Sequence, residues 1–364
     1  MVQGENSMDE IYKELCQTMA QRGGRYPGMD IPEFYSLVQE LFSPEEAAIA
    51  AAMPPKPVSV SVIAKEMNRE EKEVEPLLEG MADKGLCSSF VQEGGRLYVG
   101  IPFVPGIFEF QFMRGTRTDK DHHLARVIHD YKEAVDRPRA SRTITFPANR
   151  VIPVGETIGR GSRVHTYSQV TSYLERYDPI SVSTCSCRHE GKLLNEKSAC
   201  TMPDEVCMQF GMGAQYVIAR GLGRKISKEE AKEVLRKAAE AGLVHASRNT
   251  QEIDFLCNCG SSHCMILKTA LQQPKPGWVL YSGFQPRVNP DLCTKCEACV
   301  ERCPSRACWM GDRTPQFDMD RCFGCGVCAT GCPSEAITLE EKTGLPEPPR
   351  NRKVLREAME TKKS

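Results

Sequence analysis

The sequence lacks any long hydrophobic run, and no stretch approaches the roughly 20 apolar residues that a membrane-spanning helix needs. It begins without the basic start, apolar run and cleavage site of a secretory leader, so we expect a cytoplasmic protein. An excess of either charge is also missing, because 47 basic and 48 acidic residues give a formal charge of −1. The composition therefore provides no general attraction to nucleic acid or to an anionic membrane surface.

A nucleotide-binding fingerprint is missing as well. The glycine pairs Gly211-Met212-Gly213 and Gly221-Leu222-Gly223 lack the strand, the turn and the third glycine that give such a motif its meaning. We therefore expect no flavin or nicotinamide site.

Cysteine, by contrast, is abundant, with 18 residues in a chain of 364. In a reducing cytoplasm, ligation of metals or clusters accounts for so many thiols better than disulfide bonds do. The chain is also long enough for two or three domains with cores of their own. We therefore examined how the cysteines are spaced.

Eight cysteines near the C-terminus form two copies of one pattern, CxxCxxCxxxCP, over residues 293–304 and 322–333. This spacing is typical of two [4Fe-4S] clusters, in which the cysteine before the proline ligates the cluster of the other copy. Zinc sites also use paired cysteines, but usually with a longer spacer between the pairs. The sequence therefore predicts cluster 1 at Cys293, Cys296, Cys299 and Cys332, and cluster 2 at Cys322, Cys325, Cys328 and Cys303.

This segment closely resembles bacterial-type two-cluster ferredoxins. Asp291 and Asp320 precede the first cysteine of each copy identically, and Ala307 corresponds to Ala336. The resemblance implies a ferredoxin domain over residues 285–341 and a role in electron transfer. An extra cysteine, Cys308, aligns with Ile337 of the second copy and is expected to be a small apolar core residue.

The N-terminal segment is predicted to be largely helical at its start. Apolar residues recur at helical spacing over residues 8–21 and 31–41. Ser43 is expected to cap a further helix, with Pro44 at its first position and Glu46 completing a capping box.

A winged-helix-like domain is predicted over residues 1–112. A helix, a turn and a second helix follow one another between Ser59 and Lys84, and Gly94-Gly95 predicts the turn of a β-hairpin. Such a fold often binds DNA. However, the stretch from Asn68 to Lys84 has three basic and six acidic residues, whereas a helix in the major groove is normally basic. We therefore expect a structural or protein-docking role rather than nucleic-acid binding.

The middle segment, residues 113–284, is expected to be a helical, cysteine-rich domain. Helices are predicted over residues 204–221 and from Ser227 to Gly242, with loops that carry the cysteines beside them. Four thiolates are the number that a closed zinc site or a [4Fe-4S] cluster requires, and the ferredoxin-like segment on the same chain favours a third cluster. The four thiols predicted for this site are Cys185, Cys187, Cys200 and Cys207.

A second group in the middle segment, Cys257, Cys259 and Cys264, has three thiols and leaves several interpretations open. His263 completes the set in one, and a cysteine from elsewhere, Cys16 or Cys87, does so in another. An open coordination position would instead make the group a catalytic iron site. Alternatively, the two Cys-x-Cys loops share one cluster, or the thiols are structural.

The whole chain resembles multidomain 4Fe-4S binding proteins of anaerobic bacteria and archaea. The similar residues are 81–86 (MADKGL), 102–106 (PFVPG), 185–188 (CSCR), 207–211 (CMQFG) and 242–245 (GLVH). The resemblance implies a winged-helix-like start, a cysteine-rich middle, a C-terminal dicluster ferredoxin and an anaerobic host. The chain departs from the pattern at residues 260–263, where more cysteines are expected.

The sequence thus predicts an α+β protein of three domains, 1–112, 113–284 and 285–341, followed by a flexible tail over 342–364. We expect it to carry two [4Fe-4S] clusters and a further cluster or zinc in the middle domain. It would pass low-potential electrons to or from a partner redox protein. The alternatives are a redox-sensing winged-helix regulator and a reductase with an open iron site. No catalytic residue is assigned.

Overall fold

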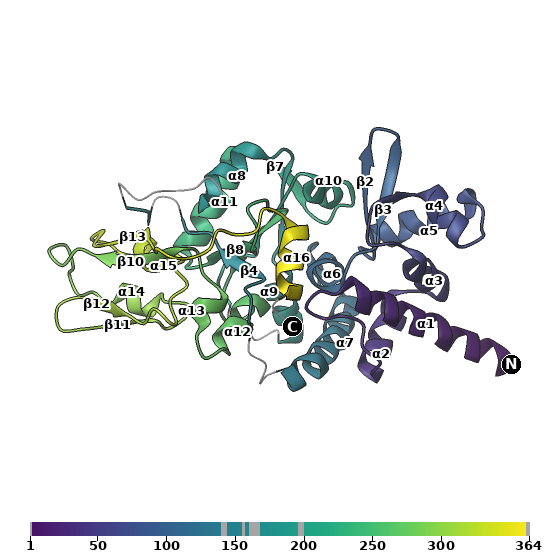
Figure 1. The fold of residues 1–364 in the computed structure, drawn as a ribbon, viewed down its shortest axis with the longest axis horizontal. Helices are drawn as coiled ribbons and strands as arrows, with labels where there is room; N and C mark the ends of the chain where they lie inside the picture. Colours follow the sequence, from purple (N-terminus) through teal and green to yellow (C-terminus); the bar gives the residue numbers. More distant parts are fainter. Residues whose placement is uncertain (1, 140–143, 155–156, 160–167, 196–199, 362–364) are drawn as a thin grey trace. The chain divides into compact units, whose positions relative to one another are not determined.

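The fold was analysed in a computed structural model, in which two compact units can be distinguished (Figure 1). Unit 1 comprises Met1–Ser141, His189–Ser198 and Gln215–Gly223, and unit 2 comprises Arg142–Arg188, Ala199–Ala214 and Arg224–Ser364. The residues that the structure describes are 2–139, 144–154, 157–159, 168–195 and 200–361.

Unit 1 combines helices with a small antiparallel sheet of order β1-β3-β2. The two helices and the hairpin predicted between Ser59 and Val99 are present; Glu93 and Gly94 form the turn, and Gly94 and Gly95 have positive φ angles of 107° and 128°. The strands are β1 (Val58–Ser59), β2 (Ser88–Gln92) and β3 (Gly95–Val99). The helices are α1 (Val2–Arg22), α2 (Pro32–Leu41), α3 (Pro44–Ala52), α4 (Val60–Glu66), α5 (Glu71–Asp83), α6 (Phe108–Phe112) and α7 (Asp119–Asp136), with a kinked segment at Phe103–Ile107 and a 3-10 turn at Arg137–Arg139.

Local sequence features explain how unit 1 is built. The capping box predicted at the start of α3 is confirmed, because Ser43 accepts a hydrogen bond from the Glu46 backbone and the Glu46 side chain accepts one from the Ser43 backbone. The aromatic segment after the hairpin supplies core residues, since Phe103 and Phe108 are buried and Phe103 packs edge-on against Tyr131 of α7.

The centre of unit 2 is a six-stranded antiparallel sheet of order β4-β8-β9-β6-β5-β7. One hydrophobic cluster contains residues of α8, α11 and the sheet, and a second contains residues of β8, β9 and α12. The strands are β4 (Asn149–Val151), β5 (Ile180–Thr184), β6 (Glu205–Phe210), β7 (Arg224–Ile226), β8 (Val244–Arg248) and β9 (Phe255–Cys259). The helices of this unit include α8 (Val170–Arg176), α11 (Lys228–Glu240), α12 (Met265–Leu271) and α13 (Pro276–Val279), whereas α9 (Ser186–Leu194) and α10 (Met212–Ala219) each have residues assigned to both units.

This sheet corrects the prediction of a helical middle segment. The helix predicted over residues 204–221 is in fact strand β6 followed by α10, whereas the helix predicted from Ser227 is confirmed as α11. The strands escaped detection because they bury polar side chains that interrupt the apolar pattern. Ser181 on β5, for example, donates a hydrogen bond of 2.7 Å to Gln209 on β6, and both are buried.

The ferredoxin-like segment belongs to unit 2 and is built as two similar halves (Figure 1). Each half has a short helix that begins after a residue in the left-handed region, Glu297 at φ 61° and Gly326 at φ 82°. The helices are α14 (Ala298–Glu301) and α15 (Val327–Thr330), and the strands form two antiparallel pairs, β10 (Phe284–Val288) with β13 (Ile337–Glu341) and β11 (Cys308–Met310) with β12 (Pro315–Phe317).

The C-terminal residues differ from the flexible tail that their composition predicts. They contain helix α16 (Arg352–Thr361), in which Leu355 is buried. Before this helix, the carbonyls of Pro349 and Arg350 accept hydrogen bonds from the backbone of Gln251 and Glu252. The last three residues of the predicted tail, 362–364, lie outside the described residues.

Candidate metal centres

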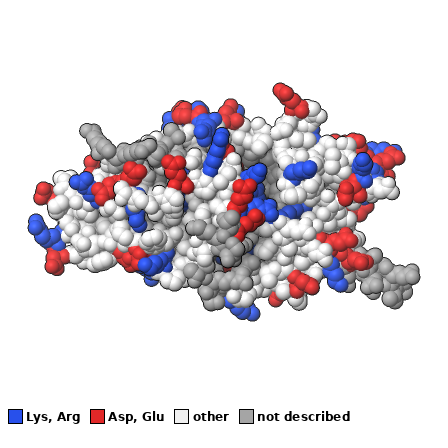
Figure 2. Space-filling view, viewed as in Figure 1, with Lys and Arg blue, Asp and Glu red and all other residues white. Residues whose placement is uncertain are grey.

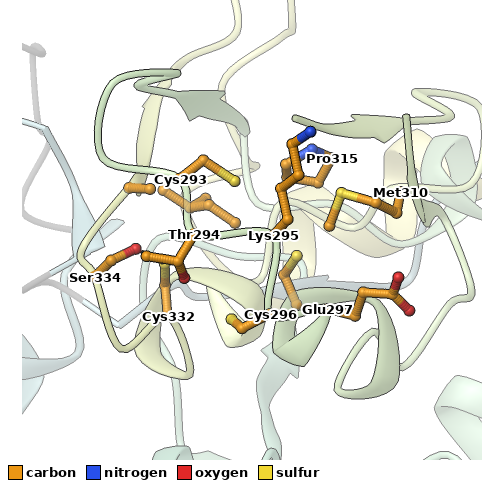
Figure 3. A pocket seen from close by; sticks show the side chains of 12 residues that line it. Cys293, Thr294, Lys295, Cys296, Glu297, Met310, Pro315, Cys332 and Ser334 are labelled. Carbon is orange, nitrogen blue, oxygen red and sulfur yellow. The ribbon is translucent and has the colours of Figure 1, made fainter. Parts of the chain in front are cut away.

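Four cysteines surround a pocket at one end of the ferredoxin-like segment. The pocket contains about 280 Å³ of empty space, which includes space open to solvent. Three of its thiols come from the loop before α14 and from that helix, and the fourth, Cys332, follows α15 in the second half of the segment. Figure 3 shows the side chains of Cys293, Cys296 and Cys332 around this space. The thiols that line it are Cys293, Cys296, Cys299 and Cys332.

A second pocket is lined by the remaining four cysteines of the two copies and contains about 320 Å³ of empty space, which includes space open to solvent. Three thiols come from the second half of the segment, and Cys303 is contributed by the first half. The structure therefore brings together the same two sets of four thiols that the sequence predicts, whereas the ligation of clusters by them stays a prediction. The thiols that line the second pocket are Cys303, Cys322, Cys325 and Cys328.

Backbone N–H groups point at several of these sulfur atoms. The amide of Ala307 donates to the Cys303 Sγ at 3.2 Å, and the amide of Gly324 donates to the Cys322 Sγ at 3.4 Å. Hydrogen bonds of this kind stabilise negative charge on sulfur and tune the potential of a cluster that the sulfur ligates. The loops are thus suited to hold thiolates.

The surroundings of Cys332 lower the pKa of its thiol and so favour the thiolate form. Burial raises the pKa of its thiol, but hydrogen bonds from the Ser334 hydroxyl and from the backbone of Ala336 and Ser334 outweigh burial and lower the pKa. In the other pocket burial dominates and raises the pKa of Cys325 to about 12. A cation at that pocket would favour the thiolate form of Cys325.

The extra cysteine of this segment, Cys308, is buried in a small apolar core, as predicted. Its neighbours there include Cys299 and Ile337. Burial raises the pKa of its thiol.

In the middle segment the structure brings the two groups of cysteines together. Four thiols form a hydrogen-bonded chain in the order Cys207, Cys257, Cys259 and Cys264, and the last two sulfur atoms are 2.9 Å apart. Cys185 and Cys187 lie close enough to interact electrostatically with members of this chain. The interpretation in which both Cys-x-Cys loops contribute to one site is therefore the one that this geometry favours.

The environment of these thiols is strongly buried. A hydrogen bond with Cys207 lowers the pKa of Cys257, but the hydrogen bond with Cys259 and burial together raise it well above its ordinary value. Burial also raises the pKa of Cys185, against the opposing charge of Arg188. Several thiolates can coexist here only beside a compensating positive charge.

The other residues considered for the middle segment have different surroundings. Cys200 follows residues 196–199, which lie outside the described part, and no described hydrogen bond joins its thiol to the chain of four. The ring of His263 is hydrogen-bonded with Ser262 at 2.8 Å. Cys16 and Cys87 are buried residues of unit 1.

In the part of the chain that the structure describes, no three His, Cys, Asp or Glu side chains are arranged to hold a single metal ion, as distinct from the thiols spaced around the two pockets. None of the described helices is long and apolar enough to cross a membrane.

Comparison with known protein families identifies the C-terminal segment. Residues 286–309 and 315–338 each match the 4Fe-4S binding domain. The two matches contain all eight cysteines of the paired pockets. No curated protein and no solved structure matched the chain. The chain therefore carries a C-terminal ferredoxin-like 4Fe-4S domain with two repeats, which supports an iron–sulfur electron-transfer role.

Proposed function

We propose that this protein is an electron carrier, or an electron-transferring subunit of an oxidoreductase, that holds two [4Fe-4S] clusters in its C-terminal domain. Each cluster, when bound, accepts or donates one electron. The first would be held by Cys293, Cys296, Cys299 and Cys332, and the second by Cys303, Cys322, Cys325 and Cys328.

One observation carries this proposal. Each pocket takes three thiols from one 4Fe-4S repeat and one thiol from the other. This crossed arrangement is the ligand pattern of two-cluster ferredoxins, and it keeps the two sites within one small domain. Two one-electron centres so close together provide a short path for electrons.

The partner proposed for this domain is another protein. Residues 285–341 carry nine acidic and six basic side chains, so a basic face on the partner would complement them. On the face drawn in Figure 2, acidic and basic side chains are mixed. Residues 1–112, proposed to be winged-helix-like, would then serve in docking or structure.

A regulator that binds DNA through this N-terminal region is disfavoured by the ion pairs there. The three basic side chains between Asn68 and Lys84 all pair with glutamates: Arg69 with Glu45 and Glu73, Lys72 with Glu70, and Lys84 with Glu46. Each of these cations therefore already has a carboxylate partner within the protein. A gel-shift experiment with duplex DNA at low salt tests this view. It would be contradicted if the protein bound the duplex and if reversing the charge of a basic residue in α5 abolished that binding.

Metal analysis tests the proposed function directly. Protein purified without oxygen should contain at least about eight irons and about eight sulfides, and dithionite should produce an EPR spectrum of interacting clusters. Simultaneous Cys296→Ser and Cys325→Ser substitutions should remove these irons. Zinc in place of iron, or protein that stays colourless after anaerobic reconstitution, would contradict the proposal.

A further inference from the structure

We propose that the two cysteine groups of the middle segment form a single site for a third iron–sulfur cluster, with Arg188 as its charge-compensating residue. The inference rests on the proposed function, because it assumes that the chain is loaded with iron–sulfur clusters. The thiols that make up this middle site are Cys185, Cys187, Cys207, Cys257, Cys259 and Cys264.

The sheet explains why thiols that are distant in sequence meet. Strand β6 lies between β5 and β9, and its Met208 is the register partner of Leu256 on β9. In an antiparallel pair this register places Cys207 opposite Cys257. The Cys185-x-Cys187 loop follows the end of β5, the other neighbour of β6, where Ser183 is paired with Cys207. The central strand thus positions both loops at the same end of the sheet.

Arg188 supplies an independent observation that points to an anion. Its side chain is among the largest that are fully buried, with a residue exposure of 1%, and its Nε has no hydrogen-bond partner. Its other nitrogens donate only to the carbonyls of Pro203 and Asn258. Within the described residues, no carboxylate forms an ion pair with it.

A buried guanidinium without a counterion is costly, so an anionic partner is expected beside it. The positive charge of Arg188 interacts with the thiol of Cys185, and Arg188 itself directly follows Cys187 in the chain. An iron–sulfur cluster with thiolate ligands carries net negative charge and would serve as the missing counterion. Arg188 therefore fits the site as a residue that stabilises the reduced, more negative state.

The number of thiols distinguishes a cluster from zinc. A structural zinc ion takes four ligands in a closed tetrahedron. The middle site offers six thiols from strands β6 and β9, the start of α9 and the adjoining loops, which suits a larger polynuclear group better than one ion. A [4Fe-4S] cluster would use four of them and leave two thiols beside it.

The middle site also adjoins the second ferredoxin-like pocket. Cys259 and Cys264 belong to the same hydrophobic cluster as Phe323 and Val327, and Cys325 of that pocket packs against it. The two sites therefore share one apolar core within unit 2. An electron from a reduced cluster held by Cys325 would have a short path to an oxidised cluster at the middle site.

The first test is a count of iron in the whole protein. The wild-type chain should bind about twelve irons rather than about eight. The double variant Cys185→Ser/Cys187→Ser and the double variant Cys257→Ser/Cys259→Ser should each lose about four irons. Because both doubles damage one site, the quadruple variant should lose no more than either double.

The outcomes separate this inference from the proposed function. The single-cluster site would be wrong if the quadruple variant lost as much iron as the two double variants together. It would also be wrong if the thiols held zinc. A wild-type protein with about eight irons and unaltered ferredoxin EPR signals would also overturn it, while leaving the two-cluster proposal intact. Cys16→Ala, a substitution outside the site, is the control. If it also lost the ferredoxin EPR signals, cysteine substitutions would be causing general misfolding. The iron content of the wild-type protein would then decide between two clusters and three.

The second test addresses Arg188. Arg188→Gln should retain the iron but make the reduction potential of the third cluster more negative, because the positive charge that stabilises the reduced form is gone. Arg188→Lys should restore most of the potential. Arg236→Gln, on the exposed face of α11, is the matched control and should leave it unchanged. An identical potential in Arg188→Gln and wild type would contradict the role given to Arg188.

Discussion

Arg302 of the ferredoxin-like domain donates hydrogen bonds to the main-chain carbonyls of Ala239 and Glu240, at 3.0 and 2.9 Å. These carbonyls belong to the C-terminal turn of α11, where the helix dipole favours a cation, and the Ala239 carbonyl also accepts a hydrogen bond from the Gly242 backbone at 3.0 Å. Arg302 therefore fixes the ferredoxin-like domain against the central part of unit 2 with charge-assisted hydrogen bonds.

Replacement of Arg302 should weaken this contact. We expect Arg302→Ala to lose about 1.5 to 3 kcal/mol of local stability, the range for hydrogen bonds to charged groups. Amide exchange measured by mass spectrometry should become faster at the end of α11 and in α15. Arg313→Ala, at an exposed arginine of the same domain, is the control. Equal exchange in the two variants would contradict the assignment.

Gly331 provides an independent way to displace Arg302. A Cβ at Gly331 would lie 2.1 Å from the Arg302 Nε, so Gly331→Ala forces the guanidinium away. Its exchange pattern should therefore match that of Arg302→Ala, and the double variant should be no worse than either single one. Additive effects in the double variant would show that the two residues act separately.

Gly324 should be essential for the loop of the second pocket. Its φ is +65°, and an added Cβ would lie 2.1 Å from the Phe284 carbonyl oxygen. Both the backbone conformation and the close approach require glycine. We expect Gly324→Ala to lose about four irons. Gly80→Ala in α5, where nothing lies within 4 Å of the new methyl group, should keep its iron and stability.

The crossed ligand sets predict which double variants lose one cluster and which lose two. Cys332→Ser combined with Cys293→Ser affects only the first pocket and should remove about four irons. Cys332→Ser combined with Cys322→Ser affects both pockets and should remove about eight. Iron analysis and EPR measure these losses. If each repeat held its own cluster, the first double variant would instead lose both clusters and the second only one.

In unit 1, the Glu79 carboxylate accepts hydrogen bonds from both terminal nitrogens of Arg220, at 3.1 Å, and from Tyr98, at 2.6 Å. Burial raises the pKa of Glu79, but these hydrogen bonds outweigh it and lower the pKa below its ordinary value of 4.5. The folded state therefore prefers the ionised carboxylate, which contributes stability above pH 4.5 that is lost as the pH falls below it.

Glu79→Gln should consequently cost about 1 to 2 kcal/mol near pH 7, and the difference from wild type should stay constant down to pH 4.5 and shrink as the pH falls below that value. Denaturant unfolding at several pH values measures this difference. Glu71→Gln, at an exposed position of the same helix, should show no such trend. A difference that stayed constant with pH would contradict the proposed ionisation.

Sequence patterns predicted much of the local structure. The capping box at Ser43 and the cap at Ser227 were correct because each depends only on hydrogen bonds between a side chain and the backbone of a residue three positions away. The hairpin around Gly94-Gly95 was likewise encoded by two residues that tolerate positive φ. The central sheet was missed, because buried polar residues such as Ser181 and Gln209 satisfy each other across strands, a pairing that no single segment reveals.

The cysteine spacing alone determined which eight thiols belong together at the C-terminus, because short loops between ligands leave few geometric choices. Only the tertiary structure decided what surrounds the remaining thiols. Cys207 meets Cys257 through strand pairing between residues fifty positions apart in the chain. Long-range pairing of this kind depends on the register of the whole sheet, which is not written in the spacing of the cysteines.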